Sequence, residues 1–219
     1  MIKLNILIAG VGGQGVVLAS DIMGETSLEA GLQVKKTDTL GMAQRGGSVI
    51  THLRIGEKVA SPLVSAGEAD ILLAFEKLEA ARWSRYLRNG ATAIVNDMSI
   101  FPLSVSLGNE SYPEDDEIIQ ILGQRAAEVM LIEGSRRAAE IGNSKVMNIF
   151  MLGALSMLMP FKPDLWERVI TRRLPPKILD INLSAFESGR REMLSILDGT
   201  PGEGGCASET QDGSCGCHQ

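Results

Sequence analysis

Apolar runs of strand length alternate with longer mixed segments through the first 134 residues. Such short runs are typical of strands that other elements cover on both faces. One run, SVITHLRIG, instead alternates polar and apolar residues, as in a strand with two unlike faces. We therefore expect strands over residues 2–9, 32–36, 48–56, 69–75, 91–97 and 128–134.

Helical patterns connect these strands and then dominate the rest of the chain. Gly31 is placed to end the first helix, because glycine commonly follows the last helical residue. Residues 144–197 are mainly helical in pattern, with Ser144 as the candidate cap and Pro160 as the end of a strongly apolar helix. We expect the connecting helices over residues 16–31, 76–87 and 115–126.

The opening order of strand, helix and strand is that of a βαβ unit and indicates a parallel sheet. We predict an α/β fold with a Rossmann-like, mainly parallel sheet, helices on both faces and a helical C-terminal part. Residues 1–197 form one predicted domain. Residues 198–219 are glycine-rich and polar, without lysine or arginine, and are predicted to be a flexible tail.

The loop after the first strand, Gly10-Val11-Gly12-Gly13-Gln14-Gly15, matches the glycine fingerprint of dinucleotide-binding proteins. A dinucleotide site also needs an acid after the second strand, and Asp38 follows Gly15 by 23 positions, near the usual spacing of about 20. Two lysines precede Asp38, and no separate substrate domain is evident. Nucleotide binding and a tight turn without a ligand both remain open.

A second candidate site lies in GMAQRGGSVITHLRIG, residues 41–56. Arg45 stands between Gln44 and paired glycines, where a guanidinium could clamp a phosphate or carboxylate. His52 is the only histidine outside the tail, and on an alternating strand we expect it to pack or hydrogen-bond rather than to catalyse.

Composition excludes several kinds of protein. The net charge of −6 and the aromatic content of 4% argue against a nucleic-acid surface. The longest apolar run, residues 149–159, is too short to cross a membrane. Cysteine occurs only at Cys206, Cys215 and Cys217, which fits a cytoplasmic protein and predicts no metal site in the domain.

Five motifs in order carry a resemblance to a known family. Together they resemble the gamma-type domain of the 2-oxoacid:ferredoxin oxidoreductases, nearest to the small (beta) subunit of the type that acts on indolepyruvate. The likeness covers residues 1 to about 197. The motifs are GVGGQGVVLAS, GMAQRGGSVITHLRIG, SPLV, GEADILLAFEKLEAAR and NIFMLGALS.

The resemblance implies a subunit of an enzyme that is inactive alone. The family decarboxylates a 2-oxoacid oxidatively with coenzyme A, giving acyl-CoA, carbon dioxide and reduced ferredoxin. A large partner subunit would hold thiamine diphosphate with magnesium and the [4Fe-4S] clusters, in a heterotetramer. The chain indeed lacks a GDG motif followed by a distant asparagine and a run of four cysteines. The cofactor-facing residues implied are Gly10, Gly12, Gly13, Gln14, Gly15, Gln44, Arg45, Gly46, Gly47 and Ser48.

Two other functions stay open from the sequence. The chain could be the gamma subunit of a pyruvate, 2-oxoisovalerate or 2-oxoglutarate enzyme, which uses separate alpha, beta and ferredoxin-like chains. It could instead be a free-standing dinucleotide-binding dehydrogenase. Cys215, Cys217 and His218 could also form a metal or redox contact in the tail, although a silent tail is the simpler hypothesis.

Overall fold

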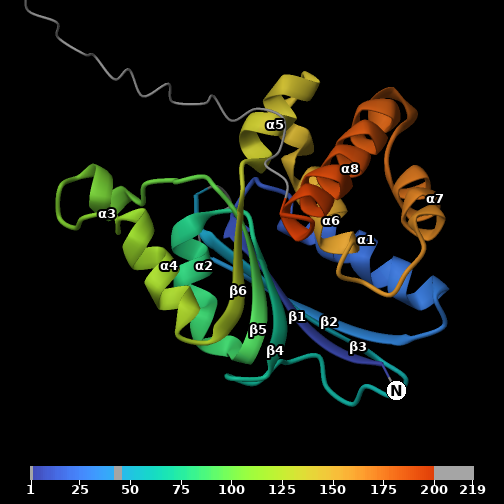
Figure 1. The fold of residues 1–219 in the computed structure, drawn as a ribbon, viewed down its shortest axis with the longest axis horizontal. Helices are drawn as coiled ribbons and strands as arrows, with labels where there is room; N and C mark the ends of the chain where they lie inside the picture. Colours follow the sequence, from blue (N-terminus) through green and yellow to red (C-terminus); the bar gives the residue numbers. More distant parts are fainter. Residues whose placement is uncertain (1, 42–45, 200–219) are drawn as a thin grey trace, which may run out of the picture.

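The computed structural model describes residues 2–41 and 46–199, and a central sheet with helices on both faces organises them (Figure 1). The sheet has six strands in the order β2-β3-β1-β4-β5-β6. Their bounds are β1 (Lys3–Val11), β2 (Gln33–Leu40), β3 (Ser48–Gly56), β4 (Ala69–Ala74), β5 (Leu87–Asn96) and β6 (Ala126–Ile132).

Strand β3 alone runs against the others. It pairs antiparallel with β1 and with β2, whereas β1, β4, β5 and β6 pair in parallel. The predicted α/β fold with a mainly parallel sheet is therefore confirmed. The expectation of a simple βαβ opening is wrong in one respect, because β3 lies between β1 and β2. Both faces of β3 are largely buried, while β2 carries polar side chains and forms the edge.

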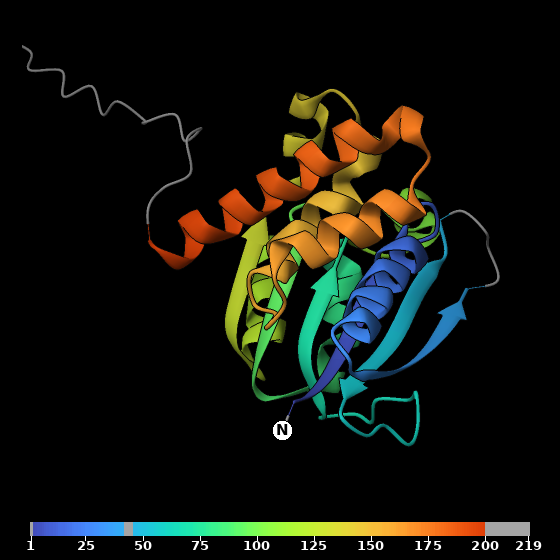
Figure 2. The ribbon, with the colours of Figure 1, turned by 90° about the vertical axis from the view of Figure 1, so that its right-hand side faces the viewer.

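Each face of the sheet has its own helices. The helices α1 (Val16–Glu29), α6 (Met147–Ser156), α7 (Pro163–Arg173) and α8 (Pro176–Leu197) cover one face, onto which Figure 2 looks. The opposite face carries α2 (Lys77–Trp83) and α4 (Asp115–Gly123). Two short helices that the sequence pattern did not predict, α3 (Leu103–Ser106) and α5 (Gly134–Ile141), follow β5 and β6.

The two faces bury separate apolar cores that share the sheet. Alternation along β1 sends Ile6 and Ile8 into the larger core and Leu7 and Ala9 into the smaller one. Trp166 of α7 is fully buried in the larger core, which also contains every apolar residue of α6.

Helices α6 and α8 approach each other closely through two glycines. A Cβ atom at Gly153 would lie 2.1 Å from the carbonyl oxygen of Phe186, and one at Gly189 would lie 1.9 Å from that of Phe150. Any side chain at either position would therefore force the two helix backbones apart.

Several predicted boundaries shift. Strand β2 continues to Leu40 rather than ending at residue 36, because its polar residues pair with β3 as an edge strand. Asn143, not Ser144, caps the helical turn before α6, since its side chain accepts a hydrogen bond from the Lys145 amide at 3.0 Å. Helix α8 ends at Leu197, while residues 200–219 of the predicted tail lie outside the described residues.

Within the part of the chain that the structure describes, no helix combines the length and the apolar character needed to cross a membrane.

Candidate functional site

The carboxyl ends of β1, β4 and β5 meet at one edge of the sheet, where the chain changes face. Helix α1, after β1, covers one face, and α2, after β4, covers the other. Such a change of face between neighbouring parallel strands opens a crevice, and ligands of open α/β sheets bind there. The same edge carries the glycine loop after β1 and the start of β3.

Gln14 fills the glycine loop from within. Its Oε1 accepts a hydrogen bond from the Val11 amide at 2.7 Å, and its Nε2 donates to the Phe75 carbonyl at 2.9 Å. The side chain thereby joins the end of β1 to the end of β4. In a dinucleotide site the glycines of this loop let the backbone approach the pyrophosphate at the helix start. Here the Gln14 side chain binds two backbone groups of the protein itself.

Two of the glycines are required by close packing. A Cβ at Gly10 would lie 2.8 Å from the Gln14 side-chain oxygen and 2.9 Å from Val16. Gly15 has a positive φ of 83°, and a Cβ there would lie 2.2 Å from Asn148 of α6. Gly13 differs, because it also has a positive φ but no heavy atom lies within 4 Å of its Cβ position. Of these three positions, Gly13 is the one that faces open space.

The two sequence motifs lie side by side. The Gly12 amide donates to the Gly47 carbonyl at 2.8 Å, and the Gly46 amide donates back to the Gly12 carbonyl at 3.4 Å. Ser48 pairs with Val11 in the β1–β3 register. The predicted site residues Gln44 and Arg45 lie outside the described residues. The cofactor contacts assigned to both loops stay predictions.

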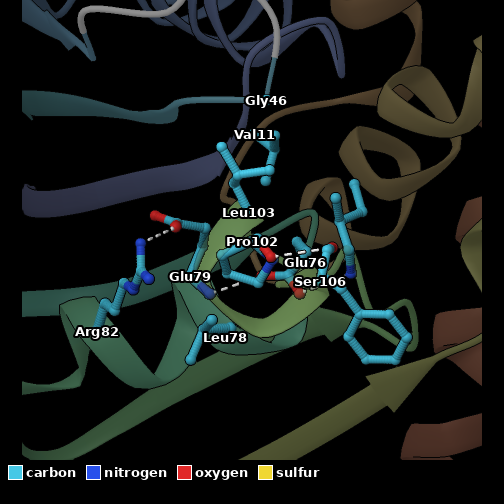
Figure 3. Close-up of a pocket in the computed structure, with 11 residues that line it drawn as sticks. Val11, Gly46, Glu76, Leu78, Glu79, Arg82, Pro102, Leu103 and Ser106 are labelled. Atoms are coloured by element: carbon cyan, nitrogen blue, oxygen red, sulfur yellow. Dashed lines mark hydrogen bonds and ion pairs between the residues drawn. The ribbon is translucent and has the colours of Figure 1, made fainter. Parts of the chain in front are cut away.

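A pocket of about 400 Å³ opens beside these loops (Figure 3). Its wall is formed by the end of β1, by Gly46 shortly before β3, by the first turns of α2 and by the segment after β5. The lining residues are Val11, Gly46, Glu76, Leu78, Glu79, Arg82, Ile100, Phe101, Pro102, Leu103 and Ser106.

Glu79 is a buried carboxylate that the sequence pattern did not single out. It is 3% exposed and lies at the pocket wall near the second loop. It accepts hydrogen bonds from the Ser48 hydroxyl, from Arg82 at 3.0 Å and from the indole of Trp83 at 3.3 Å. Since Ser48 begins β3, Glu79 fixes the start of this strand against α2. Nothing in the spacing of the sequence could have joined positions 48 and 79.

Glu76, which caps the start of α2, also lines the pocket. Its carboxylate accepts from the Glu79 and Ile100 amides at 2.7 and 3.0 Å and from the Tyr112 hydroxyl. Burial and this carboxylate raise the pKa of Tyr112 above its ordinary value, so the phenol stays protonated as a donor. Glu76 therefore ties the segment after β5 to the start of α2.

Lys77, next to these acids in the sequence, is buried and does not line the pocket. Its ammonium contacts Asp97 at 2.9 Å and Asp115 at 2.6 Å. Burial lowers the pKa of Lys77, but the two carboxylates outweigh that effect and raise it. The side chain thus remains a cation and links the helices after β4 and β5.

His52 is a packing residue, as expected. Its Nδ1 accepts a hydrogen bond from the Val64 amide at 3.2 Å, and its ring meets Tyr86 edge-on at 5.5 Å. Burial lowers the pKa of His52, so the ring is neutral at neutral pH.

Asp38 does not lie where a ribose-binding acid would. It is on edge strand β2, separated from β1 by β3, and binds Thr51 at 2.5 Å and Lys36 at 3.1 Å. In dinucleotide-binding folds the acid ends the strand beside β1. The inserted β3 therefore removes the second requirement of that site.

No group of three or more histidine, cysteine, aspartate or glutamate side chains among residues 2–41 and 46–199 is placed to hold a metal ion. The chemistry that the described part of this edge offers is thus hydrogen bonding through the glycine loop and residues 46–48, two buried carboxylates and one guanidinium, beside an open pocket.

Comparison with known proteins gives one consistent result. The family model described as pyruvate ferredoxin/flavodoxin oxidoreductase matches residues 5–192. The chain is 38% identical over 202 residues to indolepyruvate oxidoreductase subunit IorB of Thermococcus kodakarensis, covering 90% of this chain and 100% of that protein. It is 39% identical over 195 residues to the subunit of the same name from Archaeoglobus fulgidus, covering 88% and 96%.

A solved structure shares the fold. The gamma subunit of a keto/oxoacid ferredoxin oxidoreductase from Geobacter sulfurreducens superposes with a TM-score of 0.65 at 24% identity, covering 88% of this chain and 99% of that one.

Proposed function

Because the chain belongs to the pyruvate ferredoxin/flavodoxin oxidoreductase family, we propose that it is the small subunit of a 2-oxoacid ferredoxin oxidoreductase that acts on indolepyruvate. The proposed reaction joins the decarboxylated acyl group to coenzyme A, releases carbon dioxide and passes electrons to ferredoxin. The observation that carries the proposal is the likeness to IorB subunits along nearly the whole of both chains.

The proposal assigns the redox and decarboxylation chemistry to a larger partner subunit. A [4Fe-4S] cluster takes four cysteine thiolates, whereas these 219 residues contain three cysteines, all after residue 205. The partner would supply thiamine diphosphate, which carries out decarboxylation, and the clusters, which carry the electrons. Among the described residues no group of side chains is placed to hold a metal ion, so no step of this chain is derived through either cofactor.

The part proposed for this chain is to shape one wall of a shared site. Gln14 holds the glycine loop and Glu79 holds the start of β3, and the pocket between α2 and the segment after β5 opens beside them. We propose that Gly12, Gly13 and residues 46–48 face the partner's active site and exclude water from it. Gly10 and Gly15 support this wall by allowing close packing.

Co-expression with a candidate large subunit from the same organism tests the proposal. The complex should contain both chains, measured by mass in solution as a heterotetramer, and should reduce ferredoxin with indolepyruvate and coenzyme A. The large subunit without this chain should show only a small part of the activity of the complex. Full activity of the large subunit alone would contradict the proposal, and so would micromolar binding of NAD or NADP by this chain in calorimetry.

A panel of 2-oxoacids tests the substrate. We expect indolepyruvate to give the highest kcat/KM, above pyruvate, 2-oxoisovalerate and 2-oxoglutarate. A preference for one of these three would retain the subunit assignment and replace the substrate. The proposed complex works in the cytoplasm, which fractionation of cells that carry the native chain would check.

A further inference from the structure

The segment after β5 exposes three large apolar side chains within seven residues. Phe101, Leu103 and Leu107 are 60%, 74% and 66% exposed, and we call them the apolar tip. Leu103 projects beside the pocket in Figure 3. Soluble proteins seldom expose neighbouring large apolar residues without a partner for them.

The apolar tip is an ordered turn. The Leu107 amide donates to the Leu103 carbonyl at 2.9 Å, and the Asn109 amide donates to the Ser104 carbonyl at 2.9 Å. The ring of Phe101 packs edge-on against Tyr112 at 5.1 Å. Because these contacts already hold the side chains outward, a partner would bind them at little cost in conformational entropy.

An acidic border adjoins the apolar tip. Its members are exposed, and the chain has no lysine or arginine between Arg88 and Arg125. Asp115 is partly neutralised by Lys77, which leaves the border strongly acidic. The border consists of Glu110, Glu114, Asp115, Asp116 and Glu117.

The acidic border decides what can cover the apolar tip. A second copy of this chain, placed two-fold on the same patch, would bring the two acidic borders together, and like charges across an interface are unfavourable. The residues after 197 carry four acids and no lysine or arginine, so they are repelled in the same way. The complementary occupant is a separate protein with an apolar hollow edged by lysine or arginine.

We infer that the apolar tip and its acidic border form the docking surface for the large catalytic subunit, an inference that rests on the function proposed above. Leu103 belongs to both the tip and the pocket wall. A subunit seated there would cover the opening of the pocket, so the pocket would become a cavity between two chains.

Binding of the purified large subunit to variants of the full chain tests this inference. Leu107→Asp, and Leu103→Asp combined with it, should weaken binding about 30-fold or more, because a carboxylate would replace an apolar anchor. Leu28→Asp on α1 is the matched control, since Leu28 is 55% exposed on the opposite face, and it should bind as the unchanged chain does. Each isolated variant should keep the far-UV spectrum and midpoint of unfolding of the unchanged chain.

Charge reversal supplies an independent measurement. Glu114→Lys with Asp116→Lys leaves Asp115 in place for Lys77 and should weaken binding about tenfold at low salt, and less at high salt.

If the unchanged chain and the tip variants bind equally well, this inference is overturned while the proposed function stands. If the unchanged chain does not bind at all, both are overturned. If the variants still bind the large subunit but the complex no longer reduces ferredoxin, the surface would bind ferredoxin instead, and the inference would be overturned.

Discussion

Gln14 shows how far a motif can be understood from the sequence. The fingerprint correctly places a glycine turn between a strand and a helix. It does not reveal that the one long side chain inside the motif turns inward and binds the backbone at the ends of β1 and β4. That outcome depends on Phe75, 61 positions away, whose carbonyl accepts from Gln14. Glu79 was missed for the same reason, since its partner Ser48 is distant in the sequence.

Gln14→Leu should lower the free energy of unfolding by about 1–3 kcal/mol, because it leaves the Val11 amide without its acceptor. The Phe75 carbonyl keeps a second donor, Asn96, at 3.0 Å, so the Val11 amide dominates the loss. Urea unfolding of the two proteins measures the effect. Gln120→Leu, on the exposed side of α4, is the control and should change little. Equal stability of the Gln14 variant and the unchanged chain would refute this role.

At the scale of elements, periodicity predicts most strands and helices, because one face or both faces of each are buried. It fails where the bounds or the existence of an element depend on a neighbour that is distant in the sequence. Strand β2 extends to Leu40 only because β3 pairs with it, and α3 lacks an apolar stripe that faces the core. The pattern also predicts α6 and α8 as helices, but not that Gly153 and Gly189 meet between them.

Gly189→Ala should be the more damaging of two glycine replacements in helices. Its methyl group would overlap the Phe150 carbonyl, and backbone atoms cannot move aside without separating α6 from α8. We expect a loss of about 3 kcal/mol or more in the free energy of unfolding. Gly123→Ala in α4 is the matched control, because no heavy atom lies within 4 Å of its Cβ position, and it should be neutral or slightly stabilising. Similar stabilities of the two variants would show that the helices can separate without penalty.

The whole molecule has two apolar cores but a single sheet between them. Neighbouring residues of β1 point into opposite cores. If one core unfolds, the sheet that both cores share is disrupted and the other core loses its support. The two layers are therefore expected to unfold together, as small domains commonly do.

The two tryptophans make this cooperativity measurable. Trp166 is buried in the larger core, and Trp83 packs against the smaller one. In Trp83→Phe and in Trp166→Phe, the fluorescence of the remaining tryptophan should change at the same denaturant concentration as the far-UV circular dichroism of that variant. Midpoints that differ between the two probes would mean that the layers unfold separately.

The reversed strand β3 has a consequence for where the two motifs meet. Because β3 runs antiparallel to β1, it begins where β1 ends, and Ser48 lies opposite Val11. A strand in the same place that ran parallel to β1 would begin at the far end of the sheet, away from the glycine loop. The direction of this one strand thus makes one continuous surface of two motifs that are separate in the sequence.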